Sequence, residues 1–347
     1  MNNKIILVTG GTGYIGSHTV VELQKKGYDV IIVDNLSTSR RGVIKAIQKI
    51  TGITPQFEKV DLCDYKKTEV FFKKHKNISA IIHFAAFKSV GESVEKPLKY
   101  YNNNLISLIN ILNCAEKFNI KRLVFSSSCT VYGQPDKLPI SEGSPTKTAL
   151  STYGRTKQVC EEIINSVSQK NNIKSISLRY FNAAGAHESS LIGEDFIGTP
   201  SYLIPFITQT AIGKRKYLSV FGNDYDTPDG TCIRDYIHVT DLAKAHIAAI
   251  ERLLIKNDTK NYEVFNIGTG TGYSVLEIIN TFEKVSGQKL NYKIVKRRPG
   301  DVEKIWASTK YANKELKWKA EKKLDDIISS AWKWEKKINK KKEIEHE

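Results

Sequence analysis

The chain has 347 residues, of which 40% are hydrophobic and 26% charged, a balance that excludes a disordered chain and allows a large buried core. Its formal net charge is +16, but lysine far outnumbers arginine and no DNA- or RNA-binding motif accompanies the charge, so we expect no nucleic-acid partner. No apolar run approaches the roughly 20 residues of a membrane-spanning helix, so we expect no membrane partner either.

Short apolar runs that read as buried strands alternate with helical patterns through the first half of the chain. The strands are expected at residues 4–9, 30–33, 56–60, 80–84, 122–126 and 175–179. This alternation predicts an α/β fold, a Rossmann-like doubly wound parallel sheet with helices on both faces. Ligands of such sheets bind beyond the carboxyl ends of the strands.

The alternation breaks after residue 183. Loops rich in Gly, Asp and Pro are expected at 193–200 and 222–230, and strands at 235–239 and 264–267, with a helix at 241–252 between the two strands. We therefore predict two domains. Residues 1–182 form the dinucleotide-binding domain, and residues 183–347 form a smaller α/β substrate lobe, some of whose segments return to the main sheet.

A glycine-rich turn follows the first expected strand and opens a helix. In Gly11-x-Gly13-x-x-Gly16 the glycines allow a tight turn, close approach of a pyrophosphate and close packing of helix on strand. Asp34 follows at the separation of an acid that binds a ribose 2′-hydroxyl and repels a 2′-phosphate, which favours NAD over NADP. Asp61, after the third strand, either bonds the adenine ring or caps its own loop.

Tyr153 and Lys157 stand four residues apart on one expected helix, behind the triplet Ser126-Ser127-Ser128. A free phenol has a pKa of about 10, and an ammonium one turn away favours the phenolate. The pair thus predicts a proton acceptor at a redox site. A surface tyrosine beside a solvated lysine is the alternative interpretation.

Five scattered cysteines are odd in number and lack a C-x-x-C spacing, unlike a disulfide framework or a zinc site. The N-terminus lacks the pattern of a signal peptide. We expect a cytoplasmic protein without a metal.

Several stretches together resemble the extended short-chain dehydrogenase/reductase family, and within it the sugar-nucleotide 4-epimerases, from about residue 4 to about residue 335. They are T-G-G-T-G-Y-I-G-S-H (9–18), H-F-A-A (83–86), S-S-S (126–128), V-Y-G (131–133), Y-x-x-x-K (153–157), R-Y-F-N (179–182), G-N-D-Y (222–225), R-D-Y-I-H-V (234–239) and R-R-P-G-D (297–301).

The resemblance implies an isomerase that interconverts UDP-glucose and UDP-galactose through a transient 4-keto sugar. Tyr153 would take the proton of the 4-hydroxyl, Ser128 would relay or orient it, and tightly bound NAD would hold the C4 hydride. Lys157 would lower the pKa of Tyr153. The related dehydratases carry two acids directly after the position of Ser128, whereas this chain has Cys129 and Thr130 there, which disfavours dehydration.

The resemblance also implies the site residues. Those expected around the cofactor are Gly10, Gly13, Tyr14, Ile15, Gly16, Asp34, Asn35, Asp61, Leu62, Phe84, Ala85, Ala86, Lys88, Asn103, Ser126, Tyr153, Lys157 and Tyr180. Those expected around the substrate are Lys88, Ser128, Tyr153, Phe181, Asn182, Tyr202, Leu203, Arg234, Arg298, Asp301 and Ile305.

Simpler roles remain open for some of these residues. Lys88 could be a solvated loop lysine, Asn103 a helix N-cap, and Arg234 and Arg298 partners of a nearby Asp235 or Asp301.

Two positions depart from the family pattern. Ser201-Tyr202-Leu203 stands where the family usually has Asn-Asn-Leu, which puts one contact with the diphosphate in doubt. Ile305 is intermediate between the large aromatic of enzymes restricted to unacetylated hexoses and the small residue of enzymes that accept N-acetyl sugars. We expect N-acetyl forms to be poor substrates.

A homodimer is expected through helices at 103–118 and 153–169, which pair with a partner in the family. Leu105, Leu108, Ile109 and Leu112 can form an apolar face there, or that face packs only on the chain's own sheet.

The alternative functions are a related NAD-dependent UDP-sugar enzyme (an N-acetylhexosamine 4-epimerase, a decarboxylase or a net dehydrogenase) and a non-catalytic NAD sensor.

Overall fold

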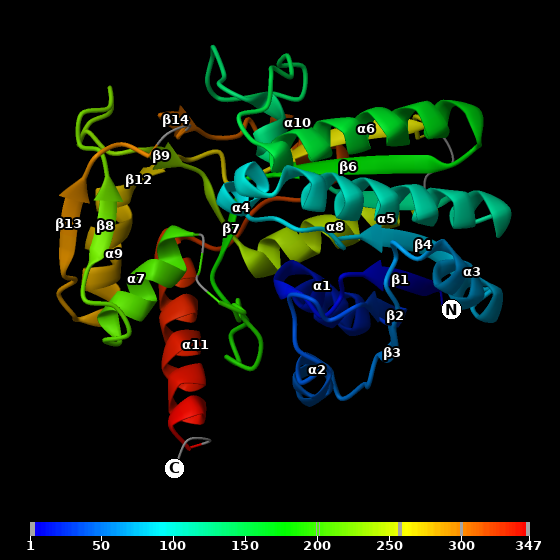
Figure 1. Cartoon of the computed structure of the whole chain (residues 1–347), viewed down its shortest axis with the longest axis horizontal. Helices are drawn as coiled ribbons and strands as arrows, with labels where there is room; N and C mark the ends of the chain where they lie inside the picture. Colours follow the sequence, from blue (N-terminus) through cyan, green and yellow to red (C-terminus); the bar gives the residue numbers. More distant parts are fainter. Residues whose placement is uncertain (1–3, 199, 201, 256–258, 299–300, 345–347) are drawn as a thin grey trace.

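A seven-stranded, wholly parallel sheet forms the centre of the computed structural model, which describes residues 4–198, 200, 202–255, 259–298 and 301–344 (Figure 1). Its strand order is β11-β6-β5-β4-β1-β2-β3. The strands are β1 (Ile5–Thr9), β2 (Asp29–Asp34), β3 (Gln56–Lys59), β4 (Ile78–His83), β5 (Arg122–Ser126), β6 (Lys174–Tyr180) and β11 (Tyr262–Ile267). The α/β fold with a doubly wound parallel sheet is confirmed, and the six strands expected in the first half lie within two residues of their expected bounds.

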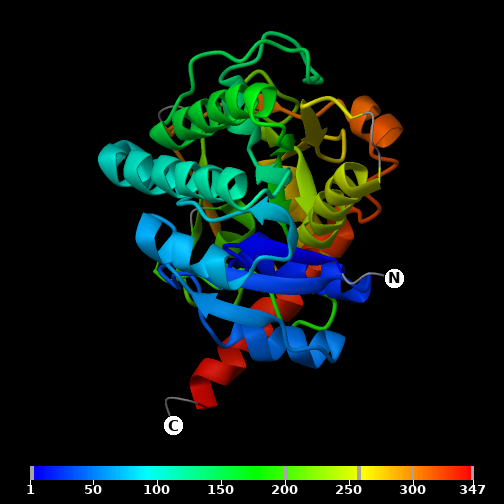
Figure 2. The ribbon, with the colours of Figure 1, turned by 90° about the vertical axis from the view of Figure 1, so that its right-hand side faces the viewer.

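Alternating side chains of the strands fill two cores, because successive residues of a strand point to opposite faces. Ile6 and Val8 of β1 pack under α1 (Tyr14–Lys25), α2 (Val43–Thr51) and α8 (Val239–Ile255). Leu7 packs under α3 (Tyr65–Lys74), α5 (Pro97–Lys117) and α6 (Thr152–Lys170). Figure 2 shows α5 and α6 side by side on one side of the sheet. The two apolar layers hold the strand ends in fixed positions.

Most of the second half of the chain forms a lobe beside the sheet (Figure 1). It contains α7 (Leu203–Ala211), α9 (Val275–Ser286), α11 (Leu324–Ile344) and the pair β8 (Leu218–Phe221) and β13 (Tyr292–Val295). A three-stranded sheet has the order β12 (Tyr273–Ser274), β9 (Ile233–Arg234) and β14 (Lys304–Ile305). A two-stranded sheet pairs β10 (Tyr236–His238) with β7 (Asn182–Ala184). Two elements of this half belong to the large sheet instead: β11 pairs with β6 and extends the sheet, and α8 packs on one of its faces.

Part of the apolar face expected on α5 is buried in the chain's own core, and part of it is exposed. Leu108 is fully buried and Leu112 is 4% exposed, and both belong to the chain's own core, against which Leu105 also packs. The expectation that these leucines face a partner is therefore wrong, because the sheet beneath them covers that stripe of the helix. Ile109, by contrast, is 40% exposed, next to Ile106 at 39%.

The strand order reverses between β1 and β4, which lie side by side while their following helices cover opposite faces of the sheet. An open crevice forms at such a switch point. Among the helices of the described residues, none combines the length and the apolar character needed to cross a membrane.

Candidate active site

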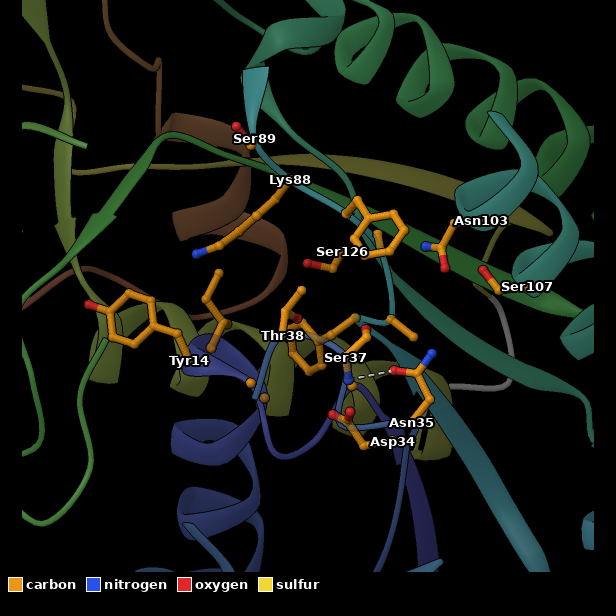
Figure 3. A pocket seen from close by; sticks show the side chains of 18 of the residues that line it. Tyr14, Asp34, Asn35, Ser37, Thr38, Lys88, Ser89, Asn103, Ser107 and Ser126 are labelled. Carbon is orange, nitrogen blue, oxygen red and sulfur yellow. Dashed lines mark hydrogen bonds between the residues drawn. The ribbon is translucent and has the colours of Figure 1, made fainter. Parts of the chain in front are cut away.

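A cavity of about 450 Å³ opens at this switch point, beyond the carboxyl ends of β1, β2, β4 and β5. Every residue expected around the cofactor lines it, from the glycine turn to Tyr180. Figure 3 shows the side chains of Tyr14, Lys88 and Ser126 around the same space as Asp34 and Asn35. The structure thus brings together residues that are up to 170 positions apart in the chain (10 to 180).

The glycine turn leaves no room for side chains. Gly10 has a φ of +67°, and a Cβ there would lie 2.8 Å from the backbone nitrogen of Ala85. A Cβ on Gly16 would lie 2.3 Å from the Gly10 carbonyl oxygen. Helix α1 begins at Tyr14 with Gly13 as its N-cap and without a side-chain cap, so its first N–H groups remain available to an anion. This cradle fits a dinucleotide pyrophosphate.

Asp34 is held in place at the end of β2. Its Oδ1 accepts from the Leu36 amide at 2.8 Å, and its Oδ2 accepts from the Thr12 amide at 3.2 Å. The carboxylate lines the cavity with lone pairs left for a ribose hydroxyl. Asp61 also lines the cavity, and its Oδ1 accepts from the Cys63 amide at 2.9 Å, so it caps its own loop while facing the same space.

Tyr153 and Lys157 lie at the wall of the same cavity, on the first turns of α6. Ser151 caps this helix by accepting from the Gly154 amide, which fixes where the helix begins. The side chains of Tyr153 and Lys157 are 6% and 3% exposed, so the alternative of a surface pair is wrong. The Lys157 ammonium donates to the Ser126 carbonyl oxygen at 2.7 Å and lies 5.8 Å from the centre of the Tyr153 ring.

Burial governs the acidity of both groups. It raises the pKa of Tyr153 well above its ordinary value, which a hydrogen bond with the Ser128 hydroxyl only partly offsets. It lowers the pKa of Lys157 to about 8. The lowering of the Tyr153 pKa by Lys157 stays a prediction, because loss of hydration sets the direction of the net shift in the protein by itself.

The residues expected around the substrate fall into two sets. Lys88, Tyr153 and Tyr202 line the cavity, and the Tyr202 hydroxyl donates to the Lys88 carbonyl oxygen at 3.2 Å. Ser201, beside Tyr202, lies outside the described residues. The remaining residues lie outside the cavity lining, on β7, β9, β14 and their loops or at the start of η1 (Cys129–Tyr132) and α7: Ser128, Phe181, Asn182, Leu203, Arg234, Arg298, Asp301 and Ile305.

Asp301 lies between the two arginines expected at a diphosphate. Its Oδ1 is 2.6 Å from Arg298 Nη2 and 3.7 Å from Arg234 Nη2. Asp235, the other acid considered, is bonded by Thr269, Gly270 and Ala307 instead. Both arginines thus form the simpler ion pair with Asp301 in this structure, and their positive charges converge on one point near β9 and β14.

Ile305 lies in a small apolar cluster. It is 4% exposed and packs with Phe181 and Cys129, the residue directly after Ser128. The cluster connects β14 to η1, which begins directly after Ser128. Asn103 lies inside α5 rather than at its start, so the alternative of an N-cap is wrong; the N-cap is Lys96.

A segment that the sequence indicated only as a loop also lines the cavity, at residues 194–197. Glu194 forms an ion pair with Lys88 at 2.7 Å, so Lys88 is not simply solvated. Asp195 forms one with Arg40 at 3.2 Å. No local pattern indicated this role, because it arises only when the second half of the chain folds over the first. Ser37 and Thr38, directly after Asp34, were also missed, although their closeness to Asp34 was a usable signal.

Comparisons with known proteins agree with this geometry. The family model for GDP-mannose 4,6 dehydratase matches residues 7–331. UDP-glucose 4-epimerase of Dictyostelium discoideum is 50% identical over 331 residues, covering 95% of each chain.

Two solved structures are similar over nearly the whole chain. The UDP-glucose 4-epimerase of Stenotrophomonas maltophila, crystallised with NAD and formylated UDP-arabinopyranose, has a TM-score of 0.94 at 44% identity, covering 97% of this chain and 99% of the other. That of Bifidobacterium longum, with NAD+ and UDP, has a TM-score of 0.92 at 46% identity, covering 96% and 98%.

Proposed function

Because this chain belongs to the GDP-mannose 4,6 dehydratase family and, within it, to the UDP-glucose 4-epimerases, we propose that it is an isomerase that interconverts UDP-glucose and UDP-galactose at C4, with NAD as its resident cofactor. One observation carries the proposal. Tyr153, Lys157 and Ser126 lie in the same cavity as the glycine cradle and Asp34, so a proton acceptor and a dinucleotide site share one space.

The chain's own residues would manage the proton and the position of the sugar. When bound, NAD supplies the oxidant that takes the C4 hydride and the reductant that returns it to the resulting 4-keto sugar. The Tyr153 phenolate accepts the proton of the 4-hydroxyl and gives it back, with the Ser128 hydroxyl as its hydrogen-bond partner. Positive charges near Tyr153 must overcome its burial, and Lys157, 5.8 Å from the centre of the Tyr153 ring, provides one of them.

Dehydration is disfavoured although the matching family model is named for a dehydratase. Removal of water from a sugar requires acid and base groups beyond the tyrosine. The two positions after Ser128 hold Cys129 and Thr130, and the Thr130 hydroxyl donates to Ser128 at 3.0 Å. Burial raises the pKa of the Cys129 thiol to about 12, so neither side chain can serve as a carboxylic acid.

Arg234 and Arg298 are proposed to bind the diphosphate of the substrate, exchanging part of their ion pairing with Asp301 for phosphate oxygens. Asn182 and Leu203 would line the same diphosphate-binding part of the substrate site. Ile305 would narrow the sugar pocket enough to disfavour N-acetyl sugars, because a β-branched side chain buried in an apolar cluster has little freedom to move aside. Equal turnover of UDP-N-acetylglucosamine and UDP-glucose would contradict that role.

The direct test uses the purified protein with no added dinucleotide. Supplied with UDP-galactose, it should form UDP-glucose, and a perchloric-acid extract of the protein should contain NAD. Steady release of NADH with an oxidised sugar product would indicate a net dehydrogenase instead. An extract without dinucleotide, together with no conversion even after NAD is added, would overturn the proposal.

We also infer a homodimer in the cytoplasm. Ile106 and Ile109 form an exposed apolar stripe on α5 that one chain leaves uncovered, and all five cysteines are free, as in a reducing compartment. Ile109→Lys should shift the mass measured by light scattering from dimer to monomer. Val70→Lys, at an apolar residue 62% exposed on α3, is the matched control and should leave the mass unchanged.

A further inference from the structure

A buried ion pair lies beside the reactive residues and has no part in the mechanism so far. Arg179 of β6 donates from Nε to Glu161 Oε1 at 3.0 Å and from Nη2 to Glu161 Oε2 at 2.5 Å. The two side chains are only 9% and 8% exposed. Buried ion pairs lose much hydration and contribute little net stability. The position of this pair therefore calls for a role other than stability.

Glu161 lies on the same face of α6 as the reactive pair. Tyr153, Lys157 and Glu161 follow each other at intervals of four residues, which places them in one row along the helix. The Ser127 hydroxyl donates to Glu161 Oε1 at 2.5 Å, and Ser127 is fully buried. The carboxylate therefore ties the end of β5 to α6 one turn beyond Lys157.

Ser127 stands between two groups that contact the reactive residues. On one side the Ser126 carbonyl oxygen accepts from Lys157, and on the other the Ser128 hydroxyl lies close enough to Tyr153 to lower the pKa of that phenol. The Ser127 amide donates to the Leu178 carbonyl oxygen of β6 at 3.0 Å. A change in the backbone at Ser127 would therefore move both neighbours at once.

Arg179 also contacts an aromatic ring. Its guanidinium lies 4.8 Å from the centre of the Tyr132 ring, and the Tyr132 hydroxyl donates to Asn266 Oδ1 at 2.7 Å. Burial by itself would lower the pKa of Arg179, but the hydrogen bonds that Arg179 donates to Glu161 raise it above its ordinary value. The guanidinium therefore stays charged and keeps the carboxylate in one orientation.

We propose that Glu161, clamped by Arg179, is a positioning residue for the epimerisation. Through the Ser127 hydroxyl it fixes the backbone of residues 126–128, which presents a carbonyl to Lys157 and a hydroxyl to Tyr153. It is not among the residues that line the cavity. This inference rests on the proposed function of the site.

The test compares two buried serines. Ser127→Ala removes only the bond to Glu161 and leaves the ion pair intact. Ser168→Ala is the matched control, since the Ser168 hydroxyl of α6 donates to Ser175 of β6 at 2.9 Å, with both residues at most 1% exposed. We expect Ser127→Ala to lower kcat about tenfold, with KM and NAD content unchanged, and Ser168→Ala to leave kcat unchanged.

A second variant tests the route through Ser127. Glu161→Gln should lower kcat in the wild-type background and have little further effect in Ser127→Ala, because the two changes break the same connection. Should Glu161→Gln fail to fold with Arg179 left unpaired, the serine comparison still decides. Equal kcat for Ser127→Ala and Ser168→Ala overturns the inference alone, whereas a wild type that does not epimerise overturns the proposed function and this inference with it.

Discussion

Tyr153 has an environment that opposes the charge its proposed role requires. It is 6% exposed, and burial raises its pKa, so the neutral phenol is favoured unless nearby positive charges stabilise the phenolate. Lys157 is a basic group in its vicinity, and burial lowers the pKa of that ammonium to about 8. The reactive phenolate is thus a property of the assembled site rather than of the tyrosine.

The first prediction concerns the phenol itself. Tyr153→Phe removes the proton acceptor without changing the shape of the cavity. Epimerisation of UDP-galactose should fall by roughly 10² to 10⁴, the usual contribution of a positioned acid–base group, while the NAD content of the purified protein stays at the wild-type level. Coupled assay of UDP-glucose and acid extraction measure the two quantities.

Tyr262→Phe is the control for this change. The Tyr262 hydroxyl donates to Ser177 at 2.9 Å on the large sheet, and Tyr262 is not among the residues that line the cavity. It should retain wild-type turnover. If Tyr153→Phe also retained it, Tyr153 would not be the proton acceptor.

The segment 193–197, which we call the strap, brings the second half of the chain over the dinucleotide site. A Cβ on Gly193 would lie 2.5 Å from the Trp334 ring, and the Trp334 indole N–H donates to the Glu194 carbonyl oxygen at 3.2 Å. Helix α11 therefore fixes the start of the strap. The pairs of Glu194 with Lys88 and of Asp195 with Arg40 fix its course along the cavity.

The second prediction follows from these contacts. Glu194→Gln breaks the ion pair with Lys88 and loosens the strap, so bound NAD should dissociate about 1.4- to 5-fold faster, the effect of a partly exposed pair of roughly 0.2–1 kcal/mol. The rate is measured by exchange of bound NAD against labelled NAD.

A matched pair far from the cavity serves as the control. Glu321→Gln breaks the pair of Glu321 with Lys244, which has the same separation of 2.7 Å, and should leave the rate unchanged. Equal rates for the two variants would show that the strap does not retain the cofactor.

Buried histidines make the stability of the whole molecule depend on pH. Burial lowers the pKa of His18 and His83 to about 3, and that of His238 and His246 to about 4. In the unfolded chain a histidine has a pKa of about 6.5. Between these values the unfolded chain binds more protons than the folded protein, so acid favours unfolding.

The third prediction gives this effect a size. The free energy of unfolding should be level above pH 6.5 and fall as the pH drops toward 4, with up to about 2 kcal/mol lost at pH 5 for each histidine. Urea unfolding at pH 7.5 and pH 5 measures the difference. His246→Gln removes one titrating group, so its difference should be smaller than that of the wild type, and an equal difference would contradict the assignment.

The sequence by itself determined the sheet and the cofactor half of the site. The strands are recognisable in the sequence as short apolar runs. The glycine turn, Asp34 after its strand, and Tyr153 with Lys157 are each short local patterns. The glycine turn and Asp34 lie at or just beyond the carboxyl ends of β1 and β2, and Tyr153 and Lys157 lie on the first turns of α6. Parallel strands bring their carboxyl ends to one edge. The expected cofactor residues therefore converge on one cavity without any knowledge of the helix packing.

Only the tertiary structure decided the contacts between distant parts of the chain. These are the strap over the cavity, the pair of Glu161 with Arg179, the engagement of Asp301 by both arginines, and the stripe of α5 that the sheet covers. The balance of acidity at Tyr153 belongs with them, because loss of hydration depends on every neighbour that excludes water. A local pattern records what a residue can do, whereas burial and pairing depend on which surfaces meet when the chain folds.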